Sequence, residues 1–145
     1  MKKQVGFNLI ELMIVVAVIA ILAAIAAPRY QRNVVNANRA SVQGDLQSAA
    51  AAMAAYRSQN FTYSGATLLG SSGVLKNPSS APYNLAFSTG ATNTAAQTYI
   101  IYATPKSGSR QVGNGALGIN QNGERCWNKS SDTTCTPGDS GQAWD

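Results

Sequence analysis

A single carboxylate lies inside the longest apolar segment of the chain. The segment runs from Phe7 to Ala27, and Glu11 is its one charged residue. As a helix it would be about 31 Å long, which matches the hydrocarbon thickness of a bilayer. An acid near one end of such a helix is costly to bury and indicates a functional group. A buried core helix is the disfavoured alternative, because the segment is apolar on every face.

Two cysteines, Cys126 and Cys135, lie close together near the C-terminus. In an exported domain, a closely spaced pair indicates one disulfide bond. The alternative is two reduced thiols in a cytosolic protein, which the apolar N-terminal segment disfavours. Two thiolates are too few to hold a metal ion, and the chain has no histidine to add. We therefore expect a disulfide and no metal.

Five basic residues in the second half of the chain fall in expected loops or strand ends, with Trp127 and Trp144 near the last two. Such groups could bind DNA phosphates, with aromatic rings against bases. Scattered solubilising charges are the favoured alternative, because the net charge of +5 is modest. We accordingly expect weak or no specific DNA binding. The five candidates are Lys76, Lys106, Arg110, Arg125 and Lys129.

The usual groups for catalysis are missing from the sequence. There is no histidine, and both cysteines are expected to be oxidised. The acids after Glu11 are sparse, and their spacing pairs none of them for acid–base work. The sequence therefore predicts neither an enzyme nor a cofactor.

Residues 29–58 have the spacing of an amphipathic helix with one apolar stripe. Pro28 removes a backbone hydrogen bond and crowds the preceding turn, so we expect one helix from Phe7 to Ser58 with a kink at Pro28. The alternative is two helices, the second opened by Pro28. The stripe consists of Val35, Val42, Leu46, Ala49, Met53 and Tyr56.

The rest of the chain predicts an antiparallel sheet, and the apolar stripe of the helix would cover one face of it. This is an α+β fold: a long N-terminal helix packed on a 3–4-stranded antiparallel sheet with a C-terminal disulfide loop. The polar tail would be tied back only by the disulfide. The expected segments are a connecting loop at 59–82, strands at 83–88, 98–104, 116–120 and 124–127 (the sheet region being 83–127), and the disulfide loop and tail at 126–145.

The N-terminal motif resembles the class III leader of type IV pilins. The matching residues are Gly6, Phe7, Leu9, Ile10, Glu11 and Leu12, followed by Pro28 at the end of the apolar run. The resemblance implies a leader at 1–6, a transmembrane and filament-core helix at 7–28, and a globular domain at 29–145 of the type IVa pilin fold. It also implies cleavage between Gly6 and Phe7 by a prepilin peptidase, N-methylation of Phe7, residence in the inner membrane, and later polymerisation into an extracellular filament.

Cleavage would place a new amine on Phe7, about one helical turn from Glu11. In a low-dielectric filament core the carboxylate needs a cation, and the Phe7 amine of a neighbouring subunit is the obvious partner. The pair would set the axial register, a role that the resemblance also assigns to this glutamate. The alternative is a pair between Glu11 and the amine of its own chain.

The chain is thus interpreted as a structural pilin subunit, with a weak preference for a minor pilin, that acts in adhesion, motility or DNA uptake. Its partners would be other pilin subunits. The first alternative is a DNA-binding minor pilin that acts as a DNA-uptake receptor, because the segments TYIIYATPKSGS and GALGINQNGERCW are similar to that branch. The second alternative is a type II secretion pseudopilin, which ranks lower because acids are sparse and a cysteine pair closes the loop.

We predict that Glu11→Ala inserts into the membrane but enters filaments poorly. Loss of one partner of a buried pair strands the other charge, at a cost of about 3–5 kcal/mol. Immunoblots of membranes and of sheared filaments would measure both steps. Normal incorporation of the variant beside wild-type subunits would contradict the register role.

Overall fold

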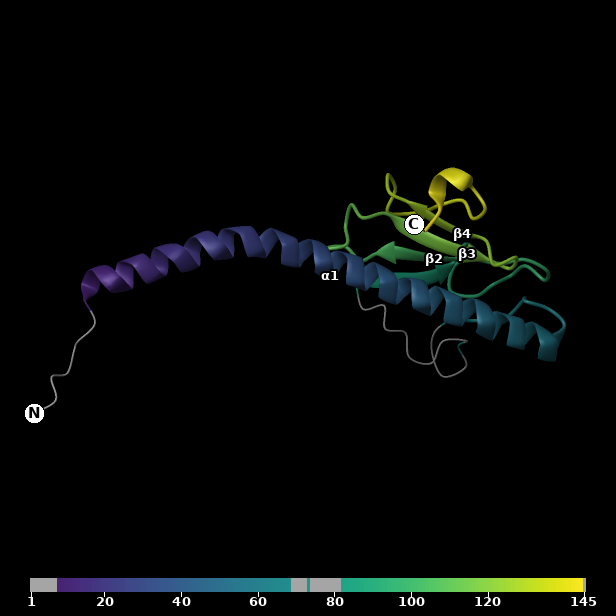
Figure 1. Cartoon of the computed structure of the whole chain (residues 1–145). Coiled ribbons are helices and arrows are strands. Elements are labelled where there is room, and N and C mark those ends of the chain that lie inside the picture. Colours follow the sequence, from purple (N-terminus) through teal and green to yellow (C-terminus); the bar gives the residue numbers. More distant parts are fainter. Residues whose placement is uncertain (1–7, 69–72, 74–81, 145) are drawn as a thin grey trace, which may run out of the picture. The chain divides into compact units, whose positions relative to one another are not determined.

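A computed structural model describes residues 8–68, 73 and 82–144 (Figure 1). The predicted cleavage and methylation residues, Gly6 and Phe7, lie outside the described residues, and so does the candidate DNA contact Lys76. The chain divides into two compact units, Met1–Asn36 and Ala37–Asp145, and each is described by itself.

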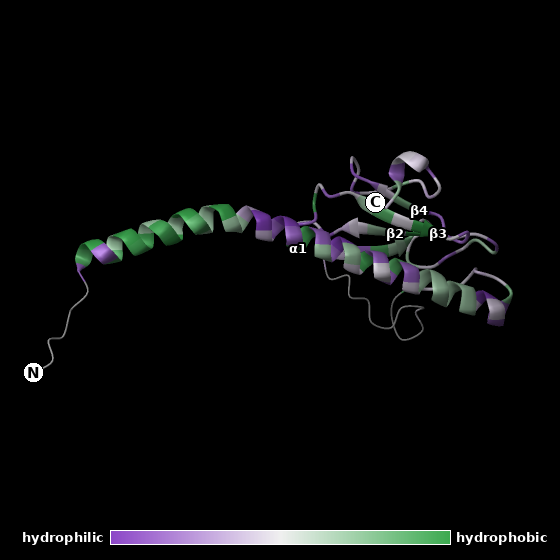
Figure 2. Ribbon diagram, in the orientation of Figure 1, coloured by the Kyte–Doolittle hydropathy of each residue, from purple (hydrophilic) through white to green (hydrophobic). Residues whose placement is uncertain are grey.

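One helix, α1 (Leu9–Asn60), supplies the described part of the first unit and the beginning of the second. Its residues are helical on both sides of Pro28, so the structure has one helix at this point and not two. From Leu9 to Ile25 its large apolar side chains are exposed, and this stretch forms the green run of Figure 2. By length and composition α1 could cross a membrane.

The second unit contains a four-stranded antiparallel sheet in the order β1-β2-β3-β4. The expected helix-on-sheet α+β fold is therefore confirmed. The bounds of β3 are the predicted ones, and those of the other three strands differ by one or two residues. The four strands are β1 (Tyr83–Phe87), β2 (Ile100–Pro105), β3 (Ala116–Asn120) and β4 (Arg125–Asn128), and a short 3₁₀ helix, η1 (Ser140–Gln142), follows.

The core lies between α1 and one face of the sheet. Four members of the predicted stripe, Val42, Leu46, Ala49 and Met53, are fully buried, and Tyr56 packs at the margin of the core. Apolar side chains of all four strands meet them. This burial is the main stabilising contribution of the domain, since a fully buried side chain of this size contributes about 1.5–3 kcal/mol.

The second face of β3, which carries Ala116, Gly118 and Asn120, is also covered. All five residues of β3 are buried: Leu117 and Ile119 belong to the core, and Gly118 lies against the disulfide. A Cβ on Gly118 would lie 2.9 Å from the Cys126 Sγ and 3.0 Å from the Cys135 Sγ. Only glycine leaves room for the sulfur atoms at this point.

The expectation that the disulfide alone ties back the C-terminal tail is wrong. Trp144 packs against the core, and its indole nitrogen donates a hydrogen bond to the Cys126 carbonyl at 2.7 Å. Its own carbonyl accepts one from Gln43 of α1 at 3.4 Å. The tail therefore covers β4, the edge strand that would otherwise expose unpaired backbone groups.

We predict that Gly115→Ala destabilises the domain much more than Gly123→Ala. Both glycines have positive φ values, 88° and 76°, which cost alanine about 1–2 kcal/mol. At Gly123 nothing lies within 4 Å of the added Cβ, whereas at Gly115 it would collide with the Asn128 carbonyl. Overpacking adds about 1–3 kcal/mol at Gly115. Urea unfolding of both variants measures the difference, and equal losses would contradict the close approach.

Candidate nucleic-acid interface

The strand register brings three of the predicted basic residues to one end of the sheet. Tyr83 pairs with Pro105 and Ala116 pairs with Asn128, so β2 and β4 end where β1 and β3 begin. Lys106 follows β2 directly, Arg110 lies in the same loop, and Lys129 follows β4. All three are exposed.

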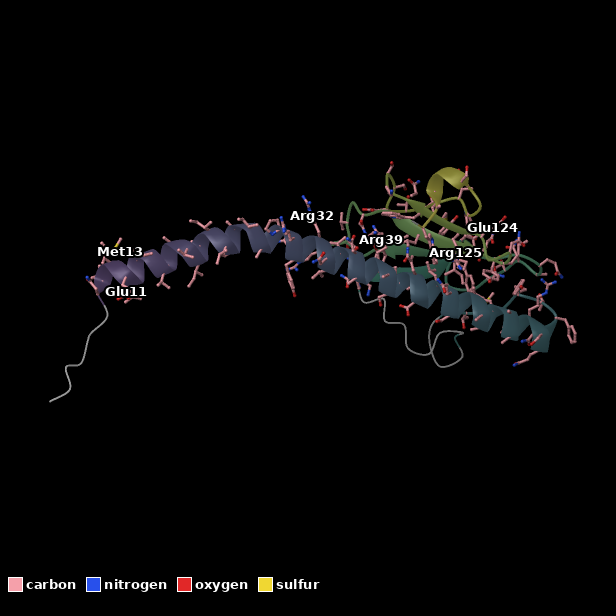
Figure 3. All side chains as sticks on the ribbon, in the orientation of Figure 1. Glu11, Met13, Arg32, Arg39, Glu124 and Arg125 are labelled. Atoms are coloured by element: carbon pink, nitrogen blue, oxygen red, sulfur yellow. A yellow bond between two sulfur atoms is a disulfide. The ribbon has the colours of Figure 1, made fainter. Side chains whose placement is uncertain are left out.

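Arg125 is placed at the opposite end of the sheet. It begins β4, opposite Ile119, and its guanidinium carbon lies 5.2 Å from the centroid of the Trp144 ring (Figure 3). Arg125 lies only four residues before Lys129 in the chain, but the extended strand between them sets their Cα atoms about 13 Å apart, and the two side chains contact different tryptophan rings. They cannot be treated as one cluster.

Trp127 contacts Lys129 and a further cation, Arg39. Its ring is 8% exposed, and its nitrogen donates a hydrogen bond to the Asn114 carbonyl at 2.7 Å. The guanidinium carbon of Arg39 lies 3.9 Å from the ring centroid, and the Lys129 ammonium nitrogen lies 4.5 Å from it. A ring this buried is no platform for a nucleic-acid base, but it holds two cations in place through cation–π attraction.

Arg39 was not among the basic residues predicted from the sequence to contact DNA. It lies on α1 (Figure 3), three residues before the buried Val42, and is half-buried. The one available signal was its place beside the apolar stripe, which sets it at the margin of the helix–sheet contact. We name Arg39, Lys106, Arg110 and Lys129 the basic site.

The loop of residues 106–115 is fastened to the segment after β4. The two carboxylate oxygens of Asp132 accept hydrogen bonds from the backbone amides of Gly113 and Gly115, at 2.6 and 2.8 Å. The Ala116 amide donates to the Ser131 carbonyl at 2.7 Å. These bonds join the two loops that carry the three exposed cations.

A buried polar network holds the same loop to β1. The Tyr83 hydroxyl donates to the Gln111 side-chain oxygen at 3.0 Å, and the Asn114 amide donates to both of these groups. Burial raises the pKa of Tyr83 above its usual value of 10.0, and the nearby Arg39 opposes that rise. The hydroxyl therefore stays protonated and available as a donor.

The expected disulfide between Cys126 and Cys135 is present, with both residues buried and their Cα atoms 5.7 Å apart. It closes the loop that contains Lys129 and Asp132. Within this loop the Asn128 amide donates to the Thr134 carbonyl at 3.2 Å. Such a short closed loop restricts the positions that Lys129 can take.

Glu11 lies in the first turn of α1. Its predicted partner is the Phe7 amine, which is outside the described residues, so the register role stays a prediction. Among residues 8–68, 73 and 82–144, no group of three or more histidine, cysteine, aspartate or glutamate side chains is placed to hold a metal ion.

Two family models match this chain, one over its N-terminus and one over most of the remainder. Residues 1–27 match the prokaryotic N-terminal methylation motif. Residues 28–117 match the family described as type IV minor pilin ComP, DNA uptake sequence receptor. The second match covers more than half of the chain, so the chain belongs to this family of type IV minor pilins. The predicted identity as a type IV pilin of the minor branch is confirmed.

A curated relative is the type II secretion system core protein G of Pseudomonas aeruginosa, which is 36% identical over 81 residues. The alignment covers 56% of each protein, so the chain spans about half the length of the curated relative it matches. The methylation motif and the apolar helix fit a membrane-anchored pilus precursor. Both families point to assembly with other pilin subunits.

We predict that Tyr83→Phe makes the alkaline loss of stability shallower. Burial favours the neutral phenol of Tyr83 in the folded state. The stability that this side chain contributes to the fold is therefore fully present below pH 10 and is lost as the pH rises from there through the raised pKa of the folded state. At neutral pH the variant loses about 1 kcal/mol with the hydroxyl hydrogen bond. Urea unfolding between neutral pH and pH 11 measures both effects, and parallel pH profiles would contradict the assignment.

Proposed function

We propose that this minor pilin binds duplex DNA through the basic site and acts as a DNA-uptake receptor within a type IV pilus. Cleavage after Gly6 by a prepilin peptidase and N-methylation of Phe7 would precede assembly. The subunit would then leave the inner membrane for an extracellular filament, with Glu11 paired to a neighbouring Phe7 amine. The proposal assigns no catalytic step to the chain.

The observation that carries the proposal is the convergence of cations from three separate chain segments. Arg39 comes from α1, Lys106 and Arg110 from the loop after β2, and Lys129 from the disulfide loop. Contacts of lysine and arginine with phosphates dominate DNA affinity, and their strength depends on local density rather than on net charge. A chain of modest net charge can therefore carry a DNA-binding surface.

Two structural features preorganise these cations for binding to DNA phosphates. Cation–π contacts with Trp127 restrict Arg39 and Lys129, which reduces the entropy lost when they are ordered by a ligand. Asp132, the acid of the disulfide loop, is occupied by two backbone amides, so its charge is partly compensated. These features favour the receptor over the purely structural subunit preferred from the sequence. The relative in type II secretion supports the pseudopilin alternative less strongly, because it aligns over about half of each chain.

We predict that Lys129→Gln weakens DNA binding and Arg125→Gln hardly changes it. The two substitutions remove one positive charge each, at opposite ends of β4, so they form a matched pair. A lost phosphate contact costs about eightfold in affinity at 0.1 M salt and reduces the salt slope by about 0.9. The triple variant with Lys106, Arg110 and Lys129 changed to Gln should lose about 500-fold.

Fluorescence anisotropy of the full chain in a neutral detergent measures these affinities. The probes are a duplex of random sequence and a duplex enriched from a random pool by the wild-type chain. Equal losses in both single variants would contradict the location of the site. Absence of binding by the wild-type chain at low salt would overturn the proposed function and leave the family membership intact.

A further inference from the structure

Asp132 is a carboxylate in the middle of a cationic surface. It is half-buried in the loop closed by Cys126 and Cys135, three residues after Lys129. An acid at this place repels DNA phosphates and, by charge alone, weakens the binding proposed above. Its presence calls for another physical role.

The contacts of Asp132 define that role. Its two oxygens take the amides of Gly113 and Gly115, both on the loop that carries Lys106 and Arg110. The two glycines have φ values of 82° and 88°, and this backbone turns both N–H groups towards the same carboxylate. Hydrogen bonds from amides to an ionised carboxylate are roughly twice as strong as neutral ones. The contact is therefore a clamp between two loops.

The clamp acts beside a close backbone contact. Gly115 approaches the Asn128 carbonyl so closely that no Cβ would fit, and Asn128 precedes Lys129. Release of the clamp would remove the two hydrogen bonds that tie Gly113 and Gly115 to the disulfide loop, and so would loosen the spacing between Lys129 on one side and Lys106 and Arg110 on the other. Phosphates along a DNA strand have a fixed spacing, so binding needs a fixed spacing of cations.

We propose that Asp132 is a positioning residue for DNA binding. It fixes the spacing between the cations of the basic site, although its own negative charge repels the DNA phosphates. This inference rests on the proposed DNA-binding function. It concerns a residue beyond 28–117, the range that matches the minor-pilin family.

The direction in which Asp132→Asn changes the DNA affinity distinguishes a positioning role from a simple effect of charge. Removal of a negative charge alone strengthens DNA binding. Loss of the clamp weakens binding and makes its salt dependence shallower, because fewer phosphates are contacted at once. We expect binding about eightfold weaker at 0.1 M salt and a salt slope smaller by about 0.9, which corresponds to one lost phosphate contact.

The matched control is Asp139→Asn. Asp139 is an exposed acid of the same C-terminal region. Within the described residues its carboxylate accepts hydrogen bonds from Gly141 and Gln142, at 2.9 and 3.1 Å, and none from the loop after β2. This variant loses the same charge and should bind DNA as tightly as wild type or more tightly. A second test variant, Asp132→Glu, keeps the charge but misplaces the carboxylate, and it should also weaken binding.

Anisotropy titrations of the full chain in neutral detergent, at several salt concentrations and with the enriched duplex, measure affinity and slope. The amide hydrogen-exchange rates of Gly113 and Gly115 measure directly whether their hydrogen bonds to Asp132 form, and both rates should increase in Asp132→Asn. Tighter binding by Asp132→Asn, wild-type binding by Asp132→Glu, or unchanged exchange at both glycines would each overturn the inference. If the wild-type chain fails to bind DNA, the proposed function is wrong, and the exchange measurement still reports whether the clamp exists.

Discussion

The site depends on one packing contact, between the Cys126–Cys135 disulfide and Gly118 of β3. The absence of a side chain at Gly118 lets both sulfur atoms lie against the sheet face that α1 does not cover. The disulfide then closes the loop that begins after β4, and so it places Lys129 and Asp132 at the end of the sheet where Lys106 follows β2. A larger residue at Gly118 would displace the loop and, with it, Lys129 of the basic site.

The same contact explains how a small domain buries a strand on both faces. β3 is covered by the helix on one side and by the disulfide on the other, and Trp144 closes the neighbouring edge. A disulfide stabilises a domain mainly by restricting its unfolded chain, by about 2–3 kcal/mol for a loop this short. Here it also replaces a second layer of secondary structure, which the short chain does not supply.

The sequence predicted the features that depend on local spacing. The apolar stripe, the four strands and the pairing of Cys126 with Cys135 follow from periodicity, turn residues and cysteine spacing, and the structure confirms them. The contact of Arg39 with Trp127 was not predictable in the same way, because it joins residues that the helix–sheet packing alone brings together. The placement of Arg125 and Lys129 at opposite ends of β4 was hidden for a similar reason, since sequence proximity does not show the length of a strand.

Net charge was a poor guide to the surface for a related reason. A total of +5 describes the whole chain, whereas a ligand responds to the charges within about one Debye length, roughly 10 Å at 0.1 M salt. The fold brings cations to one end of the sheet by ending β2 and β4 at the same edge and by packing α1 over Trp127. It also engages the one acid in the disulfide loop with backbone amides. The electrostatic character of the site is therefore a property of the sheet register, and composition alone could not reveal it.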